Sequence, residues 1–361
     1  MRGEAEDIGA QSGRLWLRGG DGSTIVDQSR AIPDHETALR IALGELKKGK
    51  YASPSAIGHR VVNGGGRYST PQKITPQILN DLRNLIPLAP LHLPAEIKIM
   101  EAVASEAPQI PQVACFDTAF HRRLPEIAQR FPLPRKLYDE GVRRYGFHGL
   151  SYEFVLQALG PAAKGQRLII AHLGNGASLA AVNDNSPVDT SMGLTPTGGV
   201  MMGTRTGDLD PGVLIYLLRE KKYDAGKLER LVNAESGLLG VSEVTSDMET
   251  LLARRDSDPR ADQAIAMFCR SIRKEIGAFA AVLGGLDMLV FTGGIGEHAA
   301  TIREEICRDL THLGVRLDST KNEASAAVIS SVQSTCQVRV IATNEELMIA
   351  RHTRAAIFGL S

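Results

Sequence analysis

A strand that leads into a glycine turn and then into a helix occurs more than once in this chain, and this pattern limits its fold more than any other feature. The apolar residues 287–291 are followed by a glycine turn at 292–297 and a helical pattern at 299–310. A strand at 337–342 passes through Asn344, a suitable helix cap, into a helix that begins at Glu345. Strands that alternate with helices are typical of α/β proteins, so we expect an α/β fold.

The other predicted elements follow from turn residues, prolines at helix starts and apolar periodicity. The segment 263–279 has apolar residues at helical spacing, which predicts a core or subunit-interface helix and not a cofactor site: Ile265, Phe268, Ile272, Ile276 and Phe279. We further expect a hairpin of residues 13–17 and 23–26 around a turn at 19–22, helices at 36–48, 76–85 and 94–104, and strands at 56–62, at 111–117 and on both sides of residues 172–176.

Composition limits the class of protein. The chain has 361 residues, of which 43% are apolar, and this favours two domains. Its 41 basic residues balance 41 acidic ones without a dense basic run, so a small-molecule ligand fits better than a nucleic acid. No apolar run reaches membrane-spanning length, and acids follow Met1 where a signal peptide would be basic and then apolar, so we expect a cytoplasmic protein. The four cysteines are far apart and are expected to be reduced and buried: Cys115, Cys269, Cys307 and Cys336.

Two glycine turns, at residues 172–176 and 293–296, can present backbone amides to an anion. The fork of an arginine can clamp a carboxylate or a phosphoryl group bidentately, and Arg205 is placed to do so. Arg205 lies among small residues between turn signals, although a structural ion pair with Asp208 or Asp210 is the alternative. Arg60 lies in an apolar strand, where its charge would need either a buried acid or an anionic substrate.

Three further residues suit phosphoryl transfer. His148 lies between glycines and could donate a hydrogen bond to developing negative charge, or it could simply support its loop. Asp117 ends an apolar strand and could orient a histidine or hold magnesium through water, and Glu345 is placed for direct magnesium ligation. As helix-cap or first-turn acids, both carboxylates would be unremarkable.

Taken together, these segments match a known family. From about Ser55 to His352 the chain resembles acetate kinases, which are members of the sugar-kinase and actin superfamily. The resemblance rests on an ordered series of motifs: Gly-His-Arg-Val-Val at 58–62, Leu-Ala-Pro-Leu-His at 88–92, Phe-Asp-Thr-Ala-Phe-His at 116–121, Arg-Tyr-Gly-Phe-His-Gly at 144–149, and the segments 189–211, 292–297 and 343–351.

The resemblance implies two ribonuclease-H-like domains around a nucleotide cleft, the first at residues 1–121 plus 347–361 and the second at 122–346. The second would bind the nucleotide and form a homodimer. The implied activity is a phosphotransferase with a carboxyl group as acceptor, which transfers the γ-phosphoryl group of ATP reversibly to acetate with Mg²⁺. Propionate or butyrate kinase activity is one alternative, and a truncated homologue that binds ligand or assembles without turnover is another.

The resemblance also assigns roles to residues. Asp117, His148 and Arg205 would be catalytic, and Glu345 would bind magnesium. The carboxylate substrate would contact Arg60, His92, Val62, Leu91, Phe147 and Pro196. The nucleotide would contact His172, Leu173, Gly174, Asn175, Gly176, Asp247, Met248, Glu249, Gly294, Ile295, Gly296, Glu297 and His298.

The chain departs from the family pattern at four positions, namely Asn63 for histidine, Leu93 for asparagine, Glu249 for arginine and His298 for asparagine. Glu249 places an acid where the family has a cation near the nucleotide, which would weaken polyphosphate binding. The family also opens with a strand and an Asn-x-Gly-Ser-Ser-Ser loop that contacts the phosphates and magnesium. No counterpart stands before Gly13, so we expect the first domain to lack its N-terminal strand and the chain as written to be poorly soluble or nearly inactive. Alternatively, the gene start lies further upstream and the full enzyme is active.

Overall fold

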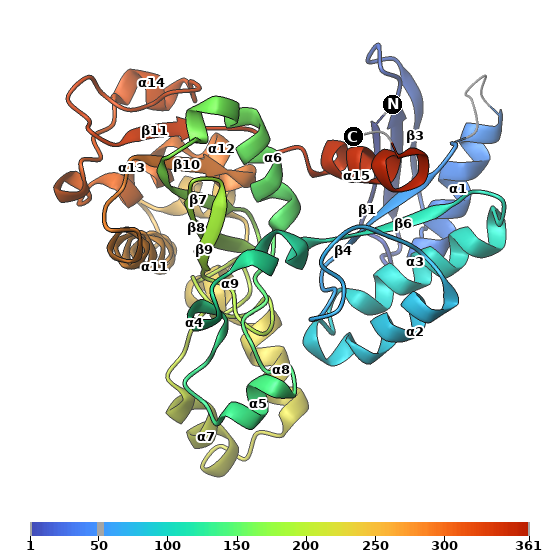
Figure 1. Cartoon of the computed structure of the whole chain (residues 1–361), viewed down its shortest axis with the longest axis horizontal. Helices are drawn as coiled ribbons and strands as arrows, with labels where there is room; N and C mark the ends of the chain where they lie inside the picture. Colours follow the sequence, from blue (N-terminus) through green and yellow to red (C-terminus); the bar gives the residue numbers. More distant parts are fainter. Residues whose placement is uncertain (1, 49–53, 360–361) are drawn as a thin grey trace. The chain divides into compact units, whose positions relative to one another are not determined.

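The computed structural model describes residues 2–48 and 54–359 (Figure 1). The chain forms two compact units. Unit 1 comprises Met1–Gly64, Thr70–Phe116 and Ile349–Ser361, and unit 2 comprises Gly65–Ser69 and Asp117–Met348.

Unit 1 begins with an antiparallel sheet, in which the described strands β1 (Arg2–Glu6), β2 (Gly13–Arg18) and β3 (Thr24–Arg30) pair in that order. The predicted hairpin is confirmed, and its turn is closed by the Gly19 N–H, which donates to the Ser23 carbonyl at 2.7 Å. Helix α1 (His35–Lys48) follows, close to the predicted range. A small core joins this sheet and helix through Leu15, Val26, Ile32 and Ala38.

The second sheet of unit 1 has β6 (Gln112–Phe116) between β4 (Ile57–Val61), which is parallel to it, and the short antiparallel β5 (Gln72–Lys73). Helices α2 (Pro76–Asn84) and α3 (Leu93–Glu106) lie where the prolines predicted them. Thr75 caps α2 by accepting the Ile78 N–H at 3.3 Å. The predicted strands and helices of this segment are therefore confirmed.

Unit 2 is built on five strands of the described chain, in the order β11-β10-β7-β8-β9. The strands β7 (Arg167–Leu173), β10 (Met288–Thr292) and β11 (Gln337–Val340) are parallel, whereas β8 (Ala177–Asn183) is antiparallel to β7 and to β9 (Ser186–Thr190). In chain order, β7, β8 and β9 form an antiparallel meander, and β10 and β11 lie on the other side of β7. This topology agrees with the predicted ribonuclease-H-like fold.

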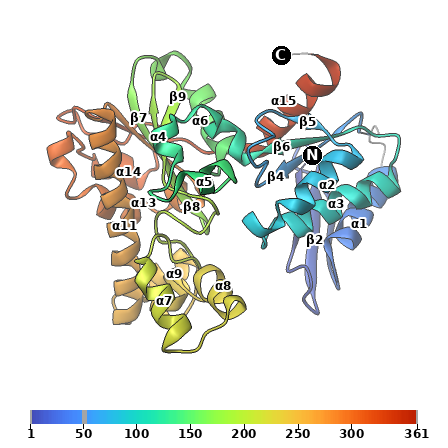
Figure 2. The same cartoon turned by 60° about the horizontal axis from the view of Figure 1, so that its bottom comes forward.

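Two helices cover the unit 2 sheet with apolar side chains. Tyr152 and Val155 of α6 (Gly149–Leu159) pack against Leu168, Ile170 and other sheet residues. The long helix α11 (Pro259–Leu283), labelled in Figure 2, contacts β7, β8 and β9. Its five predicted apolar residues are all buried within the chain: Ile265, Phe268, Ile272, Ile276 and Phe279. The core interpretation of this helix is confirmed.

Helices α7 (Pro211–Arg219), α8 (Ala225–Ala234), α9 (Gly237–Ser242) and α10 (Met248–Arg254) lie between β9 and α11 in the chain, and the sequence did not predict them. Both Figure 1 and Figure 2 show α7 and α8 beyond one end of the unit 2 sheet. Short helices α4 (Glu126–Gln129), α5 (Arg135–Asp139) and α14 (Ser319–Glu323) complete the unit with the 3-10 turn η2 (Asp117–Arg123).

The glycine turn predicted at 292–297 is wrong in one respect, because Gly293–His298 form a short helix, α12, which precedes α13 (Ala300–Cys307). The physical reason is Arg303, which is fully buried and donates to the carbonyls of Gly296 and Glu297, both at 2.9 Å. A buried guanidinium whose fork binds helix-end carbonyls stabilises helical geometry in a glycine-rich stretch. Gly293 itself has φ 76°, and a Cβ there would lie 2.8 Å from the Leu173 carbonyl.

Helix α15 (Glu345–Phe358) begins as predicted, with the Leu347 N–H donating to Asn344 Oδ1 at 2.9 Å. The four cysteines are free and buried, also as predicted. Within residues 2–48 and 54–359, none of the helices combines the length and apolar character needed to span a bilayer.

Candidate functional site

His148 is held in a buried hydrogen-bond chain. It precedes α6 in the left-handed region, with φ 56°. Its Nδ1 lies 2.8 Å from Ser178 Oγ, which in turn lies 2.5 Å from the Tyr152 hydroxyl. Burial, together with the charges of Asp117 and Glu345, raises the pKa of Tyr152, so the phenol keeps its proton and donates it to Ser178. Ser178 can then donate to Nδ1 of a neutral His148, which leaves Nε2–H as the outward donor.

Arg205 and His148 meet at the turn between β7 and β8. A Cβ built on Gly176 would lie 3.3 Å from Arg205 Nη1 and 3.4 Å from His148 Nε2. The backbone N–H of Gly203 also donates to the Asn175 carbonyl at 3.0 Å, which joins the Arg205 loop to this turn. A guanidinium, an imidazole donor and a glycine backbone therefore converge on one point, which is an arrangement suited to an anion.

Asp208 and Asp210, which the sequence offered as alternative partners of Arg205, both bond to backbone groups. Arg205 Nη1 donates to the Pro196 carbonyl at 3.1 Å. Asp208 instead accepts the Gly199 N–H at 2.7 Å, and Asp210 accepts the Gly212 N–H at 2.9 Å at the start of α7. Both carboxylates thus accept hydrogen bonds from backbone N–H groups.

His172, at the end of β7, stacks on His148 with ring centroids 4.3 Å apart and planes at 17°. Its Nδ1 lies 2.8 Å from Ser151 Oγ on α6. At the same helix start, a Cβ on Gly149 would lie 2.0 Å from the Asp117 carbonyl, so only glycine permits this approach. These contacts bring η2, α6 and β7 together around the two imidazoles.

The donor set beside Tyr152 suits a hard cation. Asp117 is fully buried, Glu345 is half-buried, and both carboxylates raise the pKa of Tyr152 through their charge. Carboxylate oxygens are the ligands that Mg²⁺ prefers, and it usually takes one or two of them with water and phosphate oxygens. Asp117 and Glu345 therefore fit Mg²⁺. Groups of three or more His, Cys, Asp or Glu suited to a metal do not occur within the described residues.

A cavity of about 640 Å³ in unit 2 holds many of the residues predicted to contact nucleotide. It is lined by Gly174, Asn175, Asp247, Met248, Glu249, Gly294, Ile295 and His298, and also by Ser246, Leu252 and Ala299, which the sequence did not single out. The predicted residues His172, Leu173, Gly176, Gly296 and Glu297 do not line it. The Glu297 carboxylate instead accepts the backbone N–H groups of Gly293 and Thr343, at 2.9 and 3.0 Å.

The charge of this cavity is unusual for a phosphate site, because the described residues that line it include no lysine or arginine. Asp247 caps α10, and hydrogen bonds from the hydroxyl and N–H of Thr250 lower the pKa of its carboxyl. Glu249 is exposed in the first turn of α10. The carboxylate oxygens of Glu249 can accept hydrogen bonds from hydroxyl and amine groups, so they suit a nucleoside more than a polyphosphate.

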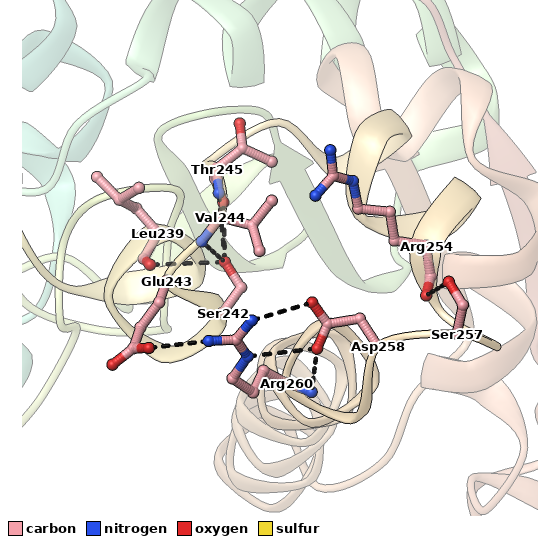
Figure 3. A network of polar contacts seen from close by, with 9 residues as sticks. All are labelled: Leu239, Ser242, Glu243, Val244, Thr245, Arg254, Ser257, Asp258 and Arg260. Atoms are coloured by element: carbon pink, nitrogen blue, oxygen red, sulfur yellow. Dashed lines mark hydrogen bonds and ion pairs between the residues drawn. The ribbon is translucent and has the colours of Figure 1, made fainter.

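The segment that leads into this cavity is fixed by a polar network (Figure 3). Ser242 Oγ accepts the N–H groups of Val244 and Thr245, at 3.2 and 3.4 Å. Arg260, on α11, donates to Glu243 at 3.0 Å and also bonds Asp258. The network ties the loop before Ser246 to the start of the long helix.

The predicted carboxylate-binding residues fall in both units. In unit 2, Phe147 is buried and its carbonyl lies 3.0 Å from His121 Nε2, and Pro196 is buried. In unit 1, Val62 is buried, Leu91 is 54% exposed, and His92 precedes α3.

The burial expected for Arg60 is wrong, because Arg60 is exposed, whereas its neighbours His59 and Val61 point into the core. Strand alternation explains the difference. Two of the four departures, Asn63 and Leu93, are fully buried, and Leu93 opens α3 as a core residue.

The sheet order of unit 2, with glycine-rich turns at the ends of adjacent strands, is that of the actin and sugar-kinase class of α/β proteins. The chain belongs to the acetokinase family, which matches residues 1–351. It is 48% identical over 345 residues to an acetate kinase of Rhodopseudomonas palustris, covering 92% of this chain and 85% of the relative. It is 46% identical over 363 residues to an acetate kinase of Methylocella silvestris, covering 98% and 89%.

Solved structures agree with this assignment. An acetate kinase of Porphyromonas gingivalis superposes with a TM-score of 0.86 at 40% identity, covering 98% of this chain and 92% of that one. A propionate kinase of Francisella tularensis superposes with a TM-score of 0.92 at 36% identity, again covering 98% and 92%. The family and the fold expected from the sequence are therefore confirmed.

Proposed function

We propose that this protein is an acetate kinase that transfers the γ-phosphoryl group of ATP to acetate. In this reaction an acetate oxygen attacks the γ-phosphorus, the bond from that phosphorus to the β–γ bridging oxygen breaks, and ADP leaves. The observation that carries the proposal is the convergence of Arg205 Nη1 and His148 Nε2 on Gly176. Phosphoryl transfer needs fixed donors around the moving oxygens more than it needs covalent chemistry.

Each catalytic residue would have a distinct task. Arg205 supplies a permanent positive charge, and His148 donates from Nε2 because Ser178 holds its Nδ1. Asp117 and Glu345 would hold Mg²⁺, which neutralises phosphate oxygens when bound. Arg60 and His92 would bind the carboxylate, with the acetate methyl against Val62, Leu91, Phe147 and Pro196.

We propose that the 640 Å³ cavity takes the base and ribose of the nucleotide. Its volume suits a ligand of this size. Its acidic lining supports this choice, because Glu249 can accept hydrogen bonds from ribose hydroxyls or an exocyclic amine but would repel phosphates. The phosphates would then extend toward residues 174–176 and Arg205.

The domain ranges 1–121 plus 347–361 and 122–346, and a homodimer formed by the second domain, belong to the same proposal. Support for an association surface in unit 2 comes from α7, which exposes several large apolar side chains: Val213, Ile215, Tyr216 and Leu218.

A propionate acceptor is the second candidate, favoured by the similarity to the propionate kinase. One methylene is worth only about 1–3 kcal/mol of discrimination, so both acids can be substrates.

Trapping the acyl phosphate with hydroxylamine tests both candidates. The full chain is incubated with ATP, Mg²⁺ and acetate, propionate or butyrate, and the hydroxamate is measured. Arg205→Leu is the inactive control, and Arg219→Gln, which removes an exposed arginine on α7, is the matched active control. Hydroxamate from acetate with the parent and Arg219→Gln, but not with Arg205→Leu, supports the proposal. Binding of ATP without any hydroxamate would contradict it and favour a ligand-binding role.

A further inference from the structure

Unit 2 contains a second polar cavity, of about 440 Å³, which lies between residues 65–69, the turn η2 and residues 129–145. Its walls include four arginines: Arg122, Arg123, Arg143 and Arg144. None of the described residues that line it is an aspartate or a glutamate. Among the described residues that line it, His121 is the one histidine, and it is neutral near pH 7 because burial lowers its pKa to about 4.

One of the four arginines has a structural role. Arg144 donates from Nη1 to the carbonyls of Thr190 and Ser191, at 3.1 and 2.9 Å. Burial raises the pKa values of Asp189 and Glu275, and the nearby charge of Arg144 opposes that rise, so part of the Arg144 charge is offset by these carboxyl groups. These contacts give Arg144 a structural role that requires no ligand.

The other three arginines are different. Arg122 donates to the Ala119 carbonyl at 3.1 Å, and Arg143 lies over the Tyr138 ring with its Cζ 4.4 Å from the centroid. The Nε of Arg143 is buried and has no hydrogen-bond partner in the described chain. Within residues 2–48 and 54–359, no ion pair to a carboxylate within 4.0 Å is found for Arg122, Arg123 or Arg143.

Other surface arginines of the described chain commonly form ion pairs with carboxylates. Arg130, next to the cavity, pairs with Glu126, and Arg255 pairs with both Asp262 and Glu305. Three uncompensated guanidinium groups around one concave site focus a positive potential into it. Their planar forks match carboxylate and phosphate oxygens.

We propose that this cavity binds a small anion that carries two or more carboxylate or phosphate groups. The volume accommodates a metabolite-sized ligand. The site is separate from the nucleotide cavity, with which it shares no lining residue. Two of its walls continue directly into proposed catalytic residues, because Thr118 follows Asp117 and Tyr145 lies shortly before His148. An anion bound there would therefore alter turnover as well as bind.

Isothermal titration of the full chain with pyrophosphate and, separately, with propane-1,2,3-tricarboxylate tests the proposal. The main variant is Arg122→Gln with Arg123→Gln, because these exposed side chains make few contacts that the fold needs. We expect at least about tenfold weaker binding for this variant, since each charge-assisted hydrogen bond contributes on that scale. Arg219→Gln removes one positive charge elsewhere and should leave binding unchanged. Circular dichroism melts check that each variant is folded.

Arg205→Leu separates this cavity from the proposed catalytic site, and it should retain the anion binding. Binding of pyrophosphate alone identifies a phosphorylated ligand, and binding of the tricarboxylate alone identifies a polycarboxylate. The proposal is overturned if neither probe binds the parent, if the double variant binds as well as Arg219→Gln does, or if Arg205→Leu is the variant that loses binding.

Discussion

The hydrogen-bond chain behind His148 makes an unusual stability prediction. Ser178 is fully buried between two buried polar groups, His148 Nδ1 at 2.8 Å and the Tyr152 hydroxyl at 2.5 Å. Ser178→Ala removes the partner of both at once. Each buried polar group left without a partner costs about 1–3 kcal/mol, so we expect a loss of about 2–6 kcal/mol from the free energy of unfolding.

Tyr152→Phe should cost only about 1 kcal/mol, because Ser178 keeps its bond to His148. The double variant, Ser178→Ala with Tyr152→Phe, removes the phenol that Ser178→Ala alone leaves unsatisfied. It should therefore be about 1 kcal/mol more stable than Ser178→Ala, although it carries one more substitution.

Urea unfolding followed by far-UV circular dichroism measures this order of stability. Fluorescence is less suitable, because the single tryptophan, Trp16, lies in unit 1. Turnover should follow a different order, since His148 loses its orientation in both variants that lack Ser178 but not in Tyr152→Phe. We expect kcat to fall about tenfold or more in the first two and to stay near the parent value in the third. A double variant less stable than Ser178→Ala would refute the hydrogen-bond chain.

Three other predictions follow from the site and the core. Arg205→Leu should lower kcat about 10³-fold or more without changing the circular dichroism spectrum, and Arg205→Lys should recover little, because a point charge cannot replace the fork; near-parental turnover would remove Arg205 from the site. Glu249→Arg should raise the KM for ATP about two- to tenfold, because arginine cannot accept hydrogen bonds from the ribose or the base, and an unchanged or lower value would show that this acid does not contact the nucleoside. Burial lowers the pKa values of His59 and His121 to about 4, so stability should be fully present above pH 6.5 and fall as pH drops toward 4, by about 1.4 kcal/mol per pH unit for each histidine. His121→Gln should make this slope shallower, and an identical slope would contradict the assignment.

Local signals in the sequence were sufficient for most of the fold. The hairpin turn at Gly19, the cap at Asn344 and the apolar stripe of α11 depend only on near neighbours in the chain, and all three are confirmed. Strand β1 carries no such signal, because Arg-Gly-Glu-Ala-Glu has no apolar alternation and becomes a strand only by pairing with β2.

Where the sequence failed, a distant partner decided the local structure. The glycines after β10 are helical because Arg303 binds the carbonyls at the end of α12, and Arg303 in turn is held by Asn322 from α14. Arg60 is exposed because the pleat of β4 turns His59 and Val61 inward, and which face is buried depends on the neighbouring helices.

For the candidate site, too, the sequence determined one part and the tertiary structure the other. The ordered motifs of the sequence were enough to identify the family and to predict His148, Gly176 and Arg205 as site residues. Each motif can be recognised from its own short segment of the chain. Their meeting at one point is a property of the tertiary structure, since it requires α6, the β7–β8 turn and the Arg205 loop to pack together. The cavity proposed to bind the nucleotide and the arginine-lined cavity also depend on the tertiary structure, because each is made of residues that are far apart in the chain and become neighbours only when the strands and helices pack.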